Sequence, residues 1–156
     1  MKNLIIIVIA ICIPTLCSAQ LNKNIWKAAG LQLGAGFVDG AKDAYLFHYS
    51  NSGKFEKWGI APNEEAWKNK WKRDQSGNVL VGQERFPLSS TSLVFLTDFY
   101  HSTKFTYNRL NEATVLVYAF GHRAKRKKWY WYAADFGIMF AAKSLGFAAS
   151  YDITFK

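Results

Sequence analysis

The apolar positions of the chain follow helical spacing over three long segments, residues 20–49, 92–120 and 129–149. The first segment carries a row of mostly small or apolar residues at steps of four and three: Ala29, Leu33, Gly36, Gly40, Asp43 and Phe47. Such a period is typical of a helix with one buried face. In the second segment a polar band near Asn108 interrupts the apolar pattern, which indicates either two shorter helices or one long helix whose polar band faces inward. The pattern predicts an all-α protein of three to four helices.

Residues 50–88, between the first two segments, lack this spacing and carry repeated turn signals of Gly, Pro, Asn and Ser. Within this connector, the run 64–73 has acidic residues at its start and basic residues at its end, an order that suits a helix dipole. Trp67 and Trp71 are four positions apart, so a helix would place them on one face among lysines. This Trp-rich composition is typical of a membrane–water interface, and equally of a small aromatic core beneath a loop. Nothing in the connector predicts a sheet.

Two pairs of glycines four positions apart lie in the first segment, Gly30 with Gly34 and Gly36 with Gly40. A glycine destabilises a water-exposed helix by about 1 kcal/mol relative to alanine. The pairs therefore indicate either a second helix in close approach, as occurs in membranes, or a glycine-rich loop. The last segment has a small face and a phenylalanine face: Ala142, Gly146 and Ala149 against Phe136, Phe140 and Phe147. We expect the small face to meet other helices and the phenylalanine face to meet lipid.

The start of the chain reads as a secretory signal peptide. Lys2 precedes an apolar run, and small residues at positions 17–19 precede Gln20. The pattern predicts cleavage after Ala19, which leaves residues 20–156 as a single helical domain. The alternative is an uncleaved anchor, but the apolar run 4–16 is shorter than the roughly 20 residues that a spanning helix needs. Both cysteines lie within residues 1–19, so the exported chain would form no disulfide.

The chain is basic, with 20 Lys and Arg against 11 Asp and Glu and a formal net charge of +9. The basic loop 122–128 and the aromatic run that follows it concentrate this charge in a predicted membrane-surface set: Arg123, Lys125, Arg126, Lys127, Lys128, Trp129 and Trp131. Basic residues beside aromatic ones favour anionic lipid headgroups, although a solvated loop would have the same composition. The sequence contains no nucleic-acid-binding motif.

An acid and an imidazole three residues apart, Asp98 and His101, are the sharpest chemical feature. We expect the second helix to begin near Pro87, so that both side chains lie on one helix face. His101 would then act as a general base and Asp98 as its partner in a hydrolase-like site. A divalent metal ion is the related possibility, with ligands drawn from one set: Asp39, Asp43, Asp98, His101 and Asp135. The simpler interpretation is a polar seam that holds helices in register, without enzymatic activity or a cofactor, and it is the one we favour.

These features together predict an exported protein of the cell envelope, in the inner membrane rather than free in the periplasm. A cleaved signal would leave the mature N-terminus in the periplasm, and the basic loop 122–128 would then lie on the cytoplasmic side. Membrane lipid is the predicted partner, with a homo-oligomer or another envelope protein as further partners. The rival arrangement is a soluble helical domain in which the same apolar faces form one core.

Several runs of the chain resemble a family of small uncharacterised envelope proteins of Bacteroidota and their phages: Ala35–Gly40, His48–Tyr49, Trp67–Lys72, Leu96–His101 and an aromatic-led last helix. The resemblance extends over most of the chain after the signal peptide. It implies a bacterial envelope location, with the Asp98/His101 pair and the region of Asp39 as recurring features. It implies no particular reaction or ligand.

Overall fold

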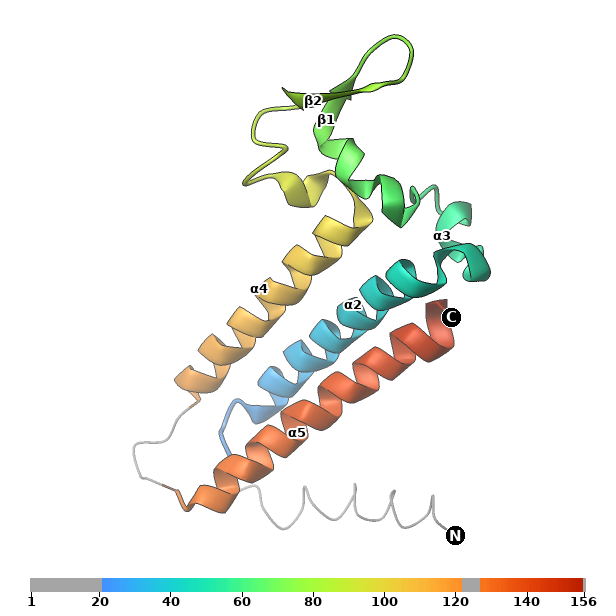
Figure 1. The fold of residues 1–156 in the computed structure, drawn as a ribbon. Helices are drawn as coiled ribbons and strands as arrows, with labels where there is room; N and C mark the ends of the chain where they lie inside the picture. The colour runs from blue at the N-terminus through green and yellow to red at the C-terminus, as the bar shows by residue number, and fades with distance from the viewer. Residues whose placement is uncertain (1–20, 122–126, 156) are drawn as a thin grey trace.

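The computed structural model describes residues 21–121 and 127–155, and helices make up most of this part of the chain. Three long helices lie side by side, α2 (Ile25–Ser52), α4 (Phe99–Phe120) and α5 (Trp129–Ala148), and α2 packs against both of the others (Figure 1). The mainly helical fold predicted from the pattern is confirmed. Among the described residues, no helix combines the length and the apolar character that crossing a membrane requires.

The backbones of α2 and α5 approach each other at glycines. A methyl group at Gly36 would overlap the carbonyl oxygen of Lys143, and one at Gly146 would overlap the carbonyl oxygen of Leu33. A methyl group at Gly40 would lie 2.6 Å from the carbonyl oxygen of Phe147. The predicted close approach is therefore confirmed for the pair Gly36 and Gly40 and for the small face of the last helix.

The other glycine pair of α2 has a different environment. A methyl group at Gly30 would have no heavy atom within 4 Å, and one at Gly34 would make an ordinary contact of 3.6 Å with Leu110. The prediction that this pair also marks a close helix contact is wrong. The two pairs share the same spacing, but they lie on different sides of α2 because Gly30 and Gly36 are six residues apart, or about 240° around the helix.

Aromatic rings form the core at one end of the three helices. Tyr45 of α2 and Phe55 of the short helix α3 (Lys54–Lys57) are fully buried, with ring centroids 5.4 Å apart. Phe155, near the end of the π-helical turn η3 (Ala149–Phe155), stacks on Phe55 at 5.3 Å. The chain turns back at Gly53, whose φ of +59° is the left-handed conformation that glycine adopts readily. This core joins the end of α2, the connector and the C-terminal turn.

The connector contains a small antiparallel sheet that the sequence did not predict. A 3₁₀ helix, η1 (Asn63–Lys70), leads into β1 (Trp71–Arg73), which pairs with β2 (Val79–Glu84). The predicted helix through Arg73 is therefore wrong in its last three residues. Trp71 lies in the strand, so Trp67 and Trp71 do not share a helix face.

The turn between these strands explains the error. The Asp74 carboxylate accepts hydrogen bonds from the backbone N–H and the side-chain amide of Asn78, at 2.8 and 3.0 Å. Gly77 supplies a φ of +84°. An acidic residue that binds its own turn, followed by a glycine with positive φ, closes a hairpin. This local chemistry outweighs the helix dipole pattern of residues 64–73.

The second long helix begins later than the apolar pattern predicts. Residues 86–98 form turns and one short 3₁₀ segment, η2 (Val94–Leu96), and α4 begins only at Phe99. From there α4 runs without a break to Phe120, so the alternative of two helices divided near Asn108 is wrong.

Candidate functional site

Asp98 is the N-terminal cap of α4 rather than a residue within a helix. Its Oδ1 accepts a hydrogen bond from the backbone N–H of His101 at 2.9 Å, and its Oδ2 lies 2.7 Å from Nδ1 of the same residue. The Thr97 hydroxyl donates to Oδ2 at 2.8 Å. The side chain of Asp98 is 3% exposed and that of His101 is 24% exposed. The carboxylate therefore orients the imidazole and satisfies a free N–H at the helix start.

The surroundings of Asp98 belong to the aromatic core. Burial raises the pKa of Tyr45 to about 12, and the negative charge of Asp98 adds to the effect. The ring of Tyr100 lies edge-on to His101 with centroids 5.4 Å apart. An aspartate that orients a histidine is an arrangement that acid–base catalysis uses, but here the same carboxylate has a structural role at the helix start.

We expect Asp98→Ala to lower the free energy of unfolding by about 1 to 2 kcal/mol, because the first turn of α4 loses its acceptor. Asp98→Asn keeps a side-chain oxygen at the cap and should lose less. Urea denaturation followed by circular dichroism measures both. Thr106→Ala, at an exposed position in the middle of α4, is the control and should change stability little. A stability of Asp98→Ala equal to that of wild type would contradict the capping role.

Asp39 and Asp43 hold a lysine of their own helix. The Lys42 ammonium lies 2.5 Å from Asp39 Oδ1 and 3.5 Å from Asp43 Oδ1, and it also lies over the ring of Tyr107 in α4 at 5.4 Å. The two carboxylates thus share one cation. A lysine of the same helix, rather than a metal ion, is therefore the partner of these two acids in the structure.

Asp135 is fully buried at the start of α5. Its carboxylate accepts hydrogen bonds from the Tyr118 hydroxyl at 2.7 Å and from the backbone N–H of Asn22 at 3.3 Å, and it forms an ion pair with Lys127. The Lys127 ammonium also lies 4.6 Å from the centre of the Tyr132 ring. The buried charge is paired and hydrogen-bonded, as a buried carboxylate requires.

The segment before α2 caps the end of α4. The side-chain amides of Asn22 and Asn24 donate to the backbone oxygens of Tyr118 and Val117, at 2.8 and 2.9 Å. Carbonyl groups in the last turn of a helix have no partner within the helix. The start of α2 therefore lies beside the end of α4, which leads into the basic loop. The predicted topology puts the start of the mature chain and the start of the basic loop on opposite sides of a membrane, whereas Asn22 and Tyr118 lie side by side.

The acidic and histidine residues of the predicted metal set do not converge. Asp98 and His101 lie near Tyr45, whereas Asp135 lies near the start of α2, and the helix rises roughly 30 Å from Ile25 to Tyr45. Asp39 and Asp43 lie between these ends, with Lys42. Within residues 21–121 and 127–155, no group of three or more His, Cys, Asp or Glu side chains is placed to hold a metal ion. The structure brings together only the Asp98/His101 pair and the Asp39/Asp43 pair.

Polar residues and glycine occupy the most buried positions of the two outer helices. These positions are Thr103 and Thr114 in α4 and Asp135 and Gly146 in α5. Polar bonds connect the three helices: Gln32 donates to Asn111 and Thr114, and Lys143 donates to the Tyr107 hydroxyl at 2.7 Å. We call this set of contacts, together with the Asp39–Lys42–Asp43 and Asp135 groups, the polar seam. It shares Asp39 and Asp135 with the predicted seam. Asp98 and His101, which the prediction also included, lie beside the aromatic core instead.

Large apolar side chains of α4 and α5 point outward instead. We call these residues the apolar surface: Val115, Leu116 and Phe120 of α4, and Phe136, Phe140 and Leu145 of α5, all more than half exposed. The phenylalanine face of the last helix is thus exposed at Phe136 and Phe140, while Phe147 stacks on Tyr151.

The residues of the predicted membrane-surface set have different environments. Arg123, Lys125 and Arg126 lie outside the described residues. Lys128 and Trp129 are exposed, whereas Lys127 is occupied by Asp135. Trp131 is partly buried, and its indole N–H has no hydrogen-bond partner within the part of the chain that the structure describes.

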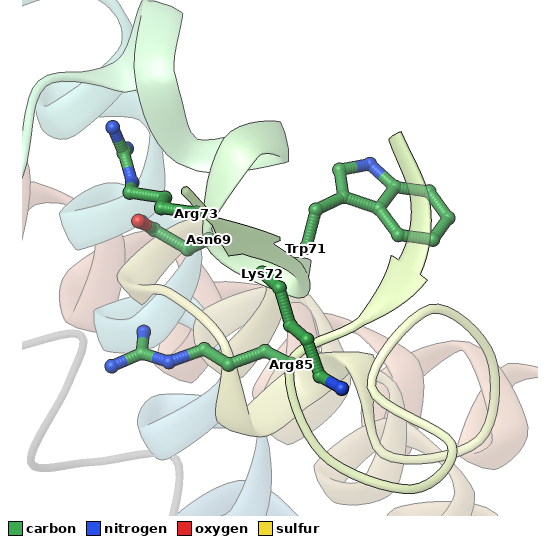
Figure 2. Close-up of a pocket in the computed structure, with 5 residues that line it drawn as sticks. All are labelled: Asn69, Trp71, Lys72, Arg73 and Arg85. Carbon is green, nitrogen blue, oxygen red and sulfur yellow. The ribbon is translucent and has the colours of Figure 1, made fainter. Parts of the chain in front are cut away.

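A cationic pocket on the hairpin is absent from the sequence predictions. Its lining residues come from the end of η1 and from both sides of the sheet: Asn69, Trp71, Lys72, Arg73 and Arg85 (Figure 2). The predicted helix over residues 64–73 gave no indication of this pocket. Arg73 and Arg85 line the same pocket only because the intervening segment folds back as a hairpin. In the sequence, the turn residues 74–78 indicate the hairpin on which this pocket forms.

Comparisons with known proteins leave the family of this chain open. No family model, no curated protein and no solved structure matches it. The resemblance to envelope proteins of Bacteroidota stays a prediction, and function has to be argued from the residues described above.

Proposed function

We propose that the protein is a non-enzymatic component of the bacterial cell envelope, tightly associated with the membrane through its apolar surface. The inverted arrangement of α5 and of the last turns of α4 is the observation that supports this proposal. Threonine, aspartate and glycine are buried there, while phenylalanine, leucine and valine are exposed. A helix that folds in water alone normally has the opposite arrangement.

Energetic considerations favour an apolar environment for this surface. Apolar area removed from water contributes about 25 cal/mol per Å². Phe136 and Phe140 are 67% and 62% exposed and stack with centroids 6.3 Å apart. Lipid acyl chains would cover such a row.

The contacts inside the bundle suit the same environment. Where lipid surrounds a protein, helices associate through small residues and interhelical hydrogen bonds rather than through large apolar side chains. The close approach of Gly36 and Gly146 and the bond from Lys143 to Tyr107 are contacts of this kind. The exposed Trp129 and Lys128 at the start of α5 have the composition of a membrane–water interface.

Vesicle flotation of the purified full chain tests the proposal. Wild type should float with phospholipid vesicles, and Phe136→Gln/Phe140→Gln should lower the partition coefficient tenfold or more, since each buried phenylalanine contributes about 1.5 to 3 kcal/mol. Phe47→Gln/Val81→Gln is the matched control, because both residues are well exposed but lie outside α4 and α5. The control should float as wild type does.

Two results would refute membrane association. In the first, wild type stays in the soluble fraction with every vesicle. In the second, both double variants float equally well. Sedimentation velocity on the same samples then shows whether the apolar surface is covered by a second copy of the chain instead.

A further inference from the structure

The hairpin pocket is lined by three cationic side chains and one amide, and it is open to solvent. Its volume is about 340 Å³. Figure 2 shows the side chains of Arg73, Asn69 and Arg85 extending in the same direction, with Asn69 between the two arginines, while Trp71 extends to the other side. Lys72 completes the lining. Each arginine carries five N–H donors in a planar fork.

The sheet is irregular beside this pocket. Trp71 pairs with Glu84, but the next residue, Lys72, pairs with Leu80, so β2 has three extra residues at this point. In a regular strand Trp71 and Arg73 would point to the same face, whereas here their side chains extend to opposite sides (Figure 2). Arg85 continues the pairing through a hydrogen bond from its backbone N–H to the carbonyl oxygen of Lys70 at 3.0 Å, which brings it near Asn69.

The cations of the pocket have no acidic partner among the described residues. None of Lys72, Arg73 and Arg85 forms an ion pair there, and Arg73 donates a single hydrogen bond, to the carbonyl oxygen of Gly77 at 3.1 Å. Most of their donors therefore remain available.

The carboxylates nearest in the sequence have other partners. Glu84 accepts hydrogen bonds from the backbone N–H groups of Leu88 and Ser90 and from the Ser90 hydroxyl, and Asp74 accepts them from Asn78. These bonds lower the pKa of both carboxyl groups. Glu65 is affected by the charge of Arg73 but forms its ion pair with Lys68, at 2.8 Å.

We propose that this pocket is a binding site for a phosphate group that carries a small organic body, such as a glycerol phosphate. Two guanidinium forks match the charge and the several oxygens of phosphate better than those of a single carboxylate. A volume of about 340 Å³ lies at the small end of ligand pockets and leaves room for more than the phosphate.

Two sources supply this chemistry, a soluble phosphate ester and the headgroup of an anionic phospholipid. Calorimetric titration at constant ionic strength with inorganic phosphate and with glycerol 3-phosphate measures the first. Binding to vesicles of phosphatidylglycerol with phosphatidylcholine, compared with phosphatidylcholine alone, measures the second. The soluble arm needs no membrane, so its result is independent of the function proposed above.

The decisive variant is Arg73→Gln/Arg85→Gln. Both side chains are exposed, so circular dichroism should show an unchanged fold. We expect binding about tenfold weaker or more, because hydrogen bonds between charged groups are lost. The matched control, Lys23→Gln/Lys27→Gln, removes the same charge at the other end of α2, where both lysines are exposed, and should bind as wild type does.

The outcomes separate the sources. A tenfold loss for the arginine variant with glycerol 3-phosphate supports a soluble ester, and the same loss only with phosphatidylglycerol vesicles supports a lipid headgroup. The proposal is overturned if wild type binds in neither arm, or if the lysine control weakens binding as much as the arginine variant in every arm where binding occurs.

Discussion

Replacement of Gly36 by alanine should lower the free energy of unfolding by about 1 to 3 kcal/mol, the range observed when a methyl group is forced into a packed interior. The reason is geometric, because the new methyl group would overlap the carbonyl oxygen of Lys143 in α5. A backbone carbonyl cannot move aside as the end of a flexible side chain can, so the two helices would have to separate. Gly146→Ala meets the backbone of α2 in the same way at Leu33, and the double variant should lose more than either single one.

Gly30→Ala is the control for this prediction, since it makes the same chemical change in the same helix. A methyl group there meets no heavy atom within 4 Å, so the substitution should stabilise α2 by up to about 1 kcal/mol through helix propensity alone. Urea denaturation under one set of solvent conditions compares the three single variants. If Gly36→Ala were as stable as Gly30→Ala, the close contact of α2 and α5 would not exist in solution.

The glycine pairs show how far the sequence alone can lead. Two glycines four residues apart leave part of one helix face without side chains, so that another backbone can come close. The face formed by Gly36 and Gly40 is indeed in close contact with α5. The same spacing at Gly30 and Gly34 carries no such contact. Which face of α2 another helix covers depends on how α4 and α5 are arranged around it. The spacing of glycines in the sequence does not determine this tertiary arrangement.

The start of α4 and the hairpin show a different source of error. The run before Asp98 is apolar enough to predict a helix, but Asp98 is a strong cap, and the Thr97 hydroxyl donates to it as well. At Asp74 a second side chain binds its own turn and closes the hairpin. In both places an aspartate with local hydrogen bonds decided the structure. Apolar periodicity had predicted a helix before Asp98, and the order of charges had predicted one over residues 64–73. Both signals were present in the sequence.

The sequence predicted that buried acids would have polar partners, but it did not predict all of the residues that serve as those partners. A polar seam was expected from Asp39, Asp98 and Asp135, and each of these acids has a polar or charged partner within the described residues. The partners Lys42 and His101 are sequence neighbours on one helix turn and were foreseeable. Lys127 was not, because its contact with Asp135 depends on how the chain enters α5.

Replacement of Lys127 by methionine should have the largest effect of any single change at the seam. It leaves the fully buried Asp135 without its cation, and breaking a buried pair by removing one partner costs about 3 to 5 kcal/mol. Two neutral donors, the Tyr118 hydroxyl and the Asn22 N–H, remain and should keep the loss toward the lower value. Lys128→Met is the matched control, because Lys128 is the next residue and is exposed.

Removal of the Asp135 charge should lower the free energy of unfolding less than removal of the Lys127 charge does. This difference tests whether Asp135 is buried in solution. In Asp135→Asn the shape of the side chain is kept, and Lys127, whose side chain is 13% exposed, is close enough to water to turn its ammonium outward. Lys127→Met/Asp135→Asn removes both charges and should recover most of the stability lost in Lys127→Met, since no unpaired buried charge is left. Equilibrium denaturation of the four proteins gives the coupling free energy. A coupling near zero would mean that the two side chains do not pair, and that Asp135 is held by the Tyr118 hydroxyl of α4 and the backbone N–H of Asn22 instead.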